Sequence, residues 1–323
     1  MNKAKNYYGI DISKDVFDVY SLEMGHHQYS NNESGFKELR KSLLPGTCCV
    51  MEATGSYHLL LAMYLYENHI PVSVVNPLVI KRYVQMKLRR TKTDKSDAEM
   101  IYRYAGEQPL TLWEPEPEHI SALKLLNSIV STYFKQSTAL KNTVHSLKVQ
   151  GISSGIGVRS LRRQLKQLSK EISGIEQEME RLITSNEETL FINLKTIPGI
   201  GKKTAMLLIS STNGFKSFEN YKQVSSFMGL APTERRSGSS TRGRTRISKT
   251  GNPKVRNHLF MCSFTACKHN GQCRALYERL VAKGKSKKLA LIAVCNKLIK
   301  QAYGIAKSGL PYDAEYKIVK TTI

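Results

Sequence analysis

The sequence is short of acidic residues. Asp and Glu together number 26 against 49 Lys and Arg, which gives a formal net charge of +23 at pH 7. A surplus of this size costs self-repulsion unless an anionic partner offsets it. Polyphosphate is the best candidate, because each neutralised phosphate releases a condensed counterion. The alternative is a generally basic soluble protein with no such partner.

Membrane and zinc signals are also missing. Residues 1–8 contain no apolar stretch of the kind found in secretory signals, and the longest apolar run, Leu59 to Tyr66, is far short of the roughly 18 residues that a membrane span needs. The six cysteines form no Cys-x-x-Cys pair, and no histidine lies at zinc-finger spacing from them. We therefore expect a cytoplasmic chain with reduced thiols and no membrane contact.

The N-terminal third alternates strand and helix patterns. Residues 6–24 are rich in Tyr, Ile and Val in alternation, which predicts two strands with a turn near residues 13–15. The further elements expected are a helix over 34–44 capped by Asn32 or Ser34, a strand over 47–51 ending at Glu52, a helix over 57–68, a strand over 71–75 stopped by Asn76-Pro77, and a helical stretch over 78–104 broken near 89–93. This order predicts an α/β domain.

The middle of the chain carries two heptad series. A Pro/Glu-rich link over 110–118 precedes them, and a Gly/Ser turn over 151–157 separates them. The apolar positions are Leu126, Val130, Tyr133, Ser137, Leu140, Val144 and Leu147, then Leu161, Leu165, Leu168, Ile172, Ile175, Met179 and Leu182. They predict an antiparallel helical hairpin or a coiled-coil dimerisation arm, with Ser160 capping the second helix. The alternative is two amphipathic helices packed on their own domain.

These patterns divide the chain into four parts. We expect a catalytic α/β domain over 1–110, a linker and coiled-coil hairpin over 111–190, a basic all-α domain over 191–312, and a tail over 313–323.

Four carboxylates are the sharpest chemical signal. Asp11 lies inside an apolar strand pattern and Glu52 ends another, whereas Asp94 and Asp97 begin a helix on one face. A carboxylate in a core strand is costly unless a positive group compensates it. Carboxylates that converge suit Mg²⁺, and paired metal ions clamp the two oxygens of a phosphodiester exchange. The alternative is that each acid is a helix cap or a surface charge.

A glycine-rich turn forms the second signal. In the segment Ile197-Pro-Gly-Ile-Gly-Lys-Lys203, a tight turn opens an apolar helix, so backbone N–H groups are free to meet a phosphate. The segment is similar to the hairpin of helix-hairpin-helix DNA-binding motifs and lacks P-loop spacing. It predicts nucleic-acid contacts at Gly199, Gly201, Lys202 and Lys203. The alternative is a plain turn between helices.

The third signal is a basic Gly/Ser loop. Its cations, which can hold phosphates, are Arg235, Arg236, Arg242, Arg244, Arg246, Lys249, Lys254 and Arg256. A serine among them could act as a nucleophile, with the cations stabilising charge at phosphorus. Composition does not choose between Ser237, Ser239 and Ser240, and a loop that only binds phosphate is the alternative.

Taken in order, these motifs resemble one family. GIDISKD, MEATGSY, KTDKSDA, IPGIGKKTA and GLAPTERRSGSSTRG followed by ISKTGNPKVR are similar to the DEDD transposases of bacterial insertion sequences. That group is related to the Piv/MooV DNA invertases and is described as bridge-RNA-guided recombinases. The resemblance runs over nearly the whole chain.

The resemblance implies a RuvC-like domain of the ribonuclease H fold, a coiled-coil arm, and a C-terminal helical transposase domain. It implies that Asp11, Glu52, Asp94 and Asp97 hold one or two Mg²⁺ ions, with Mn²⁺ as a substitute, and it selects Ser237 as the nucleophile. Its implied partners are double-stranded donor and target DNA, a structured bridge RNA, and further copies of the chain in a homodimer or homotetramer. The implied location is the bacterial nucleoid.

Two rival functions stay open at this point. One is a magnesium-dependent junction-resolving nuclease, or a DNA invertase without an RNA guide, in which Ser237 only contacts phosphate. The other is a non-enzymatic nucleic-acid-binding protein, whose binding would weaken with salt but not with magnesium removal.

Overall fold

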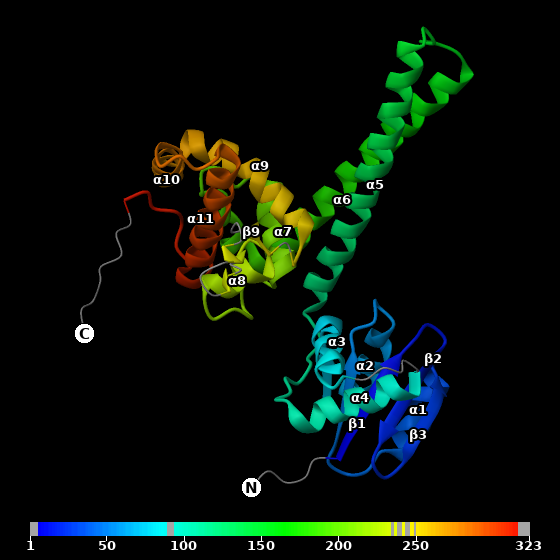
Figure 1. Ribbon diagram of the computed structural model, residues 1–323. Helices are drawn as coiled ribbons and strands as arrows, with labels where there is room; N and C mark the ends of the chain where they lie inside the picture. The colour runs from blue at the N-terminus through cyan, green and yellow to red at the C-terminus, as the bar shows by residue number, and fades with distance from the viewer. Residues whose placement is uncertain are drawn as a thin grey trace, which may run out of the picture. The chain divides into compact units, whose positions relative to one another are not determined.

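The computed structural model describes residues 6–88, 94–233, 236–237, 241–242, 246–248 and 250–315. The chain divides into two compact units, Met1–Pro115 and Glu116–Ile323 (Figure 1). The finer division of the second unit near residue 190 stays a prediction.

A five-stranded mixed sheet forms the centre of the first unit. Its strands are β1 (Asn6–Ile12), β2 (Val16–Ser21), β3 (Gly25–Ser30), β4 (Thr47–Glu52) and β5 (Val72–Val75). They lie in the order β3-β2-β1-β4-β5. β1 runs antiparallel to β2 and parallel to β4, and β4 runs parallel to β5. The C-terminal ends of β1 and β4 therefore lie side by side at the same end of the sheet.

Helices cover both faces of this sheet. They are α1 (Glu33–Ser42), α2 (His58–Glu67), α3 (Pro77–Met86) and α4 (Asp94–Glu107). Ile10 and Met51 pack with α1 and α2 in one apolar cluster. Val50 packs with Ile101 of α4 in a second cluster. Because side chains alternate along a strand, neighbouring residues of β1 and β4 serve opposite faces.

The strands and helices predicted for this unit are confirmed, with one omission. β3 was not predicted, because its sequence, GHHQYS, lacks the apolar alternation that marks a half-buried strand. Of the two helix caps considered, Asn32 is the one that acts, accepting a hydrogen bond from the backbone N–H of Gly35. The predicted break over 89–93 lies outside the described residues.

Gly9 allows α4 to lie directly on β1. A β-carbon at Gly9 would lie 2.3 Å from the carbonyl oxygen of Ala98 and 2.3 Å from the backbone nitrogen of Tyr102. The cross-strand partner of Gly9 is Tyr20, whose ring meets the ring of Tyr102 edge to face. The absence of a side chain at this position therefore sets how closely the helix approaches the strand.

We expect Gly9→Ala to lower the free energy of unfolding by about 2 kcal/mol, because helix and strand must separate to admit the methyl group. Urea unfolding followed by circular dichroism would measure the change. Gly106→Ala is the matched control, since a β-carbon there meets no heavy atom within 4 Å. Equal unfolding midpoints for the two variants would contradict the close-packing account.

The second unit begins with a long helical hairpin, α5 (Glu118–Val149) and α6 (Ile156–Lys195). Val130 and Ile172 of the two heptad series are buried in the same apolar cluster as the helices that follow. The hairpin is therefore at least partly packed on its own domain, while packing between copies stays a prediction. The predicted cap at Ser160 is wrong: α6 begins at Ile156 with Gly155 as its N-cap. Gly155 has a φ of 111°, which suits glycine.

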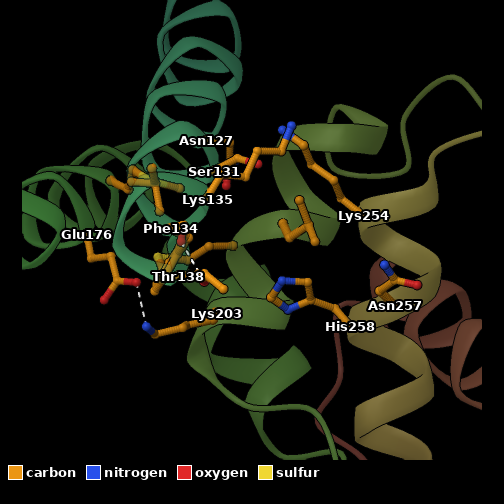
Figure 2. A pocket seen from close by; sticks show the side chains of 14 residues that line it. Asn127, Ser131, Phe134, Lys135, Thr138, Glu176, Lys203, Lys254, Asn257 and His258 are labelled. Atoms are coloured by element: carbon orange, nitrogen blue, oxygen red, sulfur yellow. Dashed lines mark hydrogen bonds and ion pairs between the residues drawn. The ribbon is translucent and has the colours of Figure 1, made fainter. Parts of the chain in front are cut away.

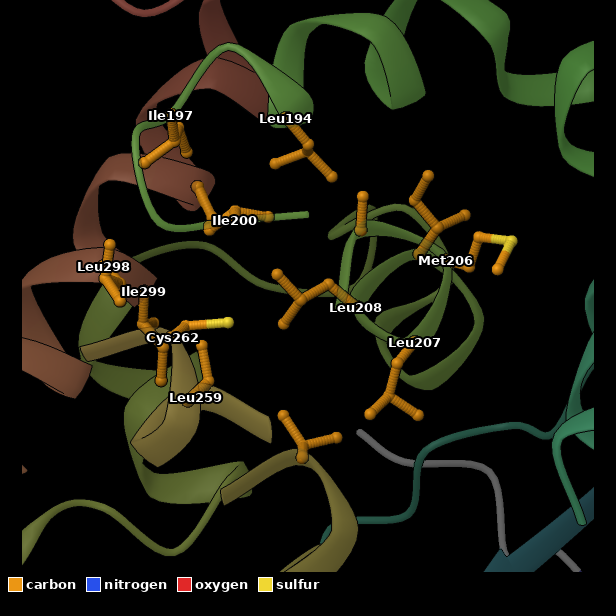
Figure 3. Packing of buried hydrophobic residues seen from close by; sticks show 14 of the residues in the cluster. Leu194, Ile197, Ile200, Met206, Leu207, Leu208, Leu259, Cys262, Leu298 and Ile299 are labelled. Carbon is orange, nitrogen blue, oxygen red and sulfur yellow. The ribbon is translucent and has the colours of Figure 1, made fainter. Parts of the chain in front are cut away.

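The rest of this unit is helical around one core. Its elements are α7 (Lys202–Thr212), α8 (Tyr221–Phe227), α9 (Pro253–His269), α10 (Gly271–Ala282) and α11 (Lys287–Ser308), with short strands β6 (Pro232–Thr233), β7 (Arg236–Ser237), β8 (Thr241–Arg242) and β9 (Arg246–Ile247). Figure 3 shows Leu208 of α7, Leu259 of α9 and Ile299 of α11 in the core cluster. The predicted fold class, an α/β domain followed by all-α structure, is confirmed.

One helix of this core is rich in apolar residues over a length greater than that of the apolar run at 59–66. Among the described residues, α11 is long and apolar enough to cross a membrane by length and composition. Its residues Val294, Leu298 and Ile299 are fully buried in the core of the second unit. The apolar character of α11 is thus accounted for by packing inside the domain.

Candidate active site

Asp11 and Glu52 lie side by side at the ends of two parallel strands. Ile10 of β1 pairs with Met51 of β4, so the next residue on each strand is the carboxylate. Residues in register on neighbouring strands point to the same face. Because Ile10 and Met51 face the core under α1 and α2, both carboxylates face the side covered by α4. Each is only partly buried.

The α4 helix brings Asp97 to this same face. Asp97 precedes Ala98, which touches Gly9, and Asp11 lies two residues along β1 from that contact. Asp97 is partly buried, and its carboxylate accepts a hydrogen bond from the Ser96 hydroxyl at 3.4 Å. The backbone of Asp94 begins α4, but its side chain lies outside the described residues.

A further carboxylate, Asp18, sits next to Asp11 and was not singled out from the sequence. Asp18 of β2 is the cross-strand partner of Asp11 and is only 4% exposed. It accepts hydrogen bonds from His26 Nε2 at 2.7 Å and from the Gln28 amide at 3.3 Å, both on β3. A signal existed, because Asp18 interrupts the apolar run Val16–Val19 much as Asp11 interrupts its own strand.

Asp18 stabilises the fold beside the site. We expect Asp18→Ala to lower the free energy of unfolding by about 2 kcal/mol, because the His26 and Gln28 side chains lose their acceptor. Thermal or urea unfolding measures this, with Asp15→Ala in the exposed turn as the control. If the two variants unfold at the same midpoint, Asp18 has no such role.

The donor set fits a hard cation in its chemistry. Carboxylate oxygens from Asp11, Glu52 and Asp97 are the ligands that Mg²⁺ takes alongside water and phosphate oxygens. Within the ranges whose side chains are described, no group of three or more His, Cys, Asp and Glu side chains is close enough to hold a metal ion. The fourth carboxylate, on Asp94, falls outside those ranges.

The described residues of the basic Gly/Ser loop form two short antiparallel strand pairs. Thr233 of β6 pairs with Arg246 of β9, and further along Ser237 of β7 pairs with Thr241 of β8. Ser239 and Ser240 lie outside the described residues, as does the Ser237 side chain.

Two glycines let the segments that flank this loop pack closely together. A β-carbon at Gly229 would lie 2.7 Å from the carbonyl oxygen of Thr250, and one at Gly251 would lie 2.2 Å from that of Phe227. The Arg256 guanidinium donates a hydrogen bond to the Met228 carbonyl at 3.0 Å beside them. Arg256, predicted to contact nucleic acid, thus also ties α9 to the C-terminal end of α8.

The other predicted phosphate contacts fall into several groups. Lys202 and Lys203 are ion-paired to Glu180 and Glu176 of α6. Gly199 packs against Ala266 of α9, where a β-carbon would come within 2.8 Å. The remaining predictions comprise Gly201, the N-cap of α7; Arg246 and Lys254, which are exposed; Arg236 and Arg242, whose side chains are not described; and Arg235, Arg244 and Lys249, which lie outside the described residues.

The thiols do not supply a nucleophile in the helical core. All six cysteines are free, as predicted, and burial raises the pKa of Cys273 and of Cys295 to about 12. Burial also raises the pKa of Cys262 above its ordinary value. These thiols are therefore protonated at neutral pH and act as small apolar groups.

Comparison with known proteins relates both units of the chain to transposases. Residues 8–150 match a family model described as a transposase of the DEDD IS110 type, and residues 192–278 match the transposase IS116/IS110/IS902 family. The chain is 31% identical to the pilin gene-inverting protein of Moraxella bovis over 96% of its own length and 98% of the relative. It is 24% identical to the transposase for insertion sequence element IS1111A of Coxiella burnetii, covering 90% of this chain and 86% of the relative.

Proposed function

The chain belongs to the IS110 family of DEDD transposases, and from this premise we propose that it breaks and rejoins DNA through a serine nucleophile assisted by a magnesium-bound carboxylate site. Membership makes it a transposase or recombinase family enzyme that acts on DNA. The observation that carries the proposal is the placement of Asp11 beside Glu52 on neighbouring parallel strands. Isolated surface acids or helix caps have no reason to share a register at the ends of two core strands.

The proposed chemistry is a reversible exchange at phosphorus. The Ser237 oxygen attacks a DNA phosphodiester, a serine–phosphorus bond forms, and the bond to the 3′-oxygen breaks. The serine proton leaves and the departing 3′-oxygen gains one, so a free 3′-hydroxyl results. The 3′-hydroxyl of the partner strand then attacks the phosphoserine and releases the serine. The energy of the phosphodiester is kept throughout, and no ATP is consumed.

The carboxylates have a supporting role in this scheme. Asp11, Glu52, Asp94 and Asp97 would hold the cation, which would offset the negative charge that develops at phosphorus. Asp18 fixes His26 and Gln28 next to this set and keeps β2 in place beside Asp11. The arginines of the basic Gly/Ser loop hold the flanking phosphates of the same DNA strand.

The proposed assembly has more than one chain and more than one nucleic acid. We propose a homodimer or homotetramer formed through the α5–α6 hairpin, with donor and target duplex DNA bound to it and a structured bridge RNA guiding the choice of site. The net charge of +23 supports such a load of polyanion. The bacterial cytoplasm, at the nucleoid, is the proposed place of action.

A recombination assay tests this function. The full chain is incubated with Mg²⁺, RNA transcribed from the flanks of the native element, and labelled donor and target duplexes. We expect joined donor–target strands on a denaturing gel. Nicked ends with no joined product would favour a junction-resolving nuclease. Binding that falls with salt and ignores magnesium, with no cut strand, would favour a non-enzymatic binding protein.

A DNA invertase that needs no guide is the second candidate. The observation that favours it is the similarity, over nearly the whole length of both chains, to the pilin gene-inverting protein of Moraxella bovis. The same assay without RNA separates the two readings. Inversion of a segment between inverted repeats in the absence of RNA would favour the invertase.

A further inference from the structure

A cavity of about 640 Å³ opens between the helical hairpin and the C-terminal helices within the second unit. Residues from α5, α6, α7 and α9 line it, and the two facing walls are α5 and the first turns of α9 (Figure 2). This volume lies in the range of ligand-binding pockets. Its described lining residues all belong to the second unit.

The floor of the cavity is apolar and one aromatic ring is exposed above it. Val130, Met179 and Met206 are buried there. Phe134 of α5 is 44% exposed, and the Lys203 ammonium lies 5.3 Å from the centre of its ring. An exposed phenyl ring beside a cation is a surface on which a planar base stacks.

The rim carries an excess of positive charge. Lys135, Lys203 and Lys254 reach the cavity from three different helices, and Glu176 is the one carboxylate among the described residues that line it. Glu176 is ion-paired to Lys203 (Figure 2). Lys135 and Lys254 have no ion-pair partner among the side chains that the structure describes. Like charges gathered around an apolar hollow repel one another until an anion joins them.

His258 adds a hydrogen-bonding group to the α9 wall. Partial burial and the nearby ammonium of Lys203 lower the pKa of His258 below its ordinary value. The imidazole is therefore neutral at pH 7 and can accept a hydrogen bond. Together with the Asn257 amide on the same wall, it offers polar edges to a ligand above the apolar floor.

We propose that this cavity binds one unstacked nucleotide of a single-stranded nucleic acid, with its base on Phe134 and its flanking phosphates at Lys135 and Lys254. A base paired inside a duplex cannot enter a hollow of this kind without leaving its stack. This inference adds a site for a single strand to the proposed recombinase. It rests on the proposed function, because that function makes nucleic acid the ligand. The chemistry of base and phosphate is shared by RNA and DNA, so the test compares both.

Fluorescence anisotropy tests the site with labelled oligodeoxythymidine and oligouridine of about 10 nucleotides. The full chain is compared with Phe134→Ala and with the double variant Lys135→Ala, Lys254→Ala. We expect each to bind about tenfold more weakly. Phe134→Tyr, which keeps the ring, restores binding, and Lys141→Ala, an exposed lysine further along α5, serves as the charge control. The oligonucleotide that binds more tightly shows whether the site takes RNA or DNA.

Photo-crosslinking of iodouracil-substituted strands gives an independent readout at the ring. We expect the crosslinked peptide to contain Phe134 and the crosslink to vanish in Phe134→Leu, while circular dichroism is unchanged. Crosslinks only elsewhere, or pocket variants that bind single strands like wild type, would overturn the inference. If wild type still recombines duplex DNA in that case, the proposed function stands and the pocket inference alone fails.

Discussion

Ser237→Ala is expected to slow strand exchange by roughly four to six orders of magnitude, because the variant has no oxygen with which to attack phosphorus. The expected signature is a DNA band that wild type shifts upward on a denaturing gel and that protease treatment returns. In the variant this covalent adduct is absent, while binding of duplex DNA measured by gel shift stays within about twofold, since a single hydroxyl contributes little to affinity.

The controls for the Ser237 variant are other serines of the basic Gly/Ser loop. Ser239→Ala and Ser240→Ala alter hydroxyls two and three residues away, and both should form the adduct at a rate near that of wild type. The backbone of Ser237 pairs with that of Thr241 on the neighbouring strand. Normal product formation by Ser237→Ala would rule out the serine mechanism, and nicking by both proteins without an adduct would point to water as the nucleophile.

Glu52→Gln is expected to lower the rate of strand exchange by roughly a thousandfold with little change in DNA binding, because one ligand charge for the cation is lost. Asp11→Asn should match it, since the two residues occupy adjacent positions on parallel strands. Single-turnover kinetics with preformed protein–DNA complexes would measure the rate. Asp15→Asn, in the exposed turn of the same hairpin, is the matched control.

Chelation extends this second prediction to the metal. Removing divalent ions should stop wild type, and adding back Mg²⁺ or Mn²⁺ should restore it. Glu52→Gln should need a higher magnesium concentration for half of its maximal rate, because a ligand set with less negative charge binds the ion more weakly. A variant with the wild-type rate and magnesium dependence would remove Glu52 from the site.

Much of the fold could be predicted from local sequence patterns. The β1–β2 hairpin followed from alternation and the helical hairpin from heptads, since both periodicities record which face of an element is buried. β4 followed from a short, continuous run that reads as a buried strand. Helix ends were less well determined. Ser160 satisfied the residue preference for a cap, yet α6 begins at Ile156, because the chain turns at Gly155 before that serine is reached.

By itself the sequence also determined the class of chemistry. The positions of Asp11 and Glu52 inside apolar strand patterns, the basic Gly/Ser loop, and the motif order together led to the family that the comparisons establish. These are properties of short segments. They can be recognised in the sequence because a charged residue in apolar surroundings is costly and is therefore unusual.

Only the tertiary structure decided which of these residues meet. The register of β1 with β4 sets Asp11 beside Glu52, and the register of β1 with β2 sets Asp18 beside Asp11, neither of which any local pattern contains. The cavity at Phe134 arises in the same way, from four helices whose segments lie far apart in the chain. Contacts of this kind depend on packing between distant segments, and the free energy that selects them comes from burying apolar faces together.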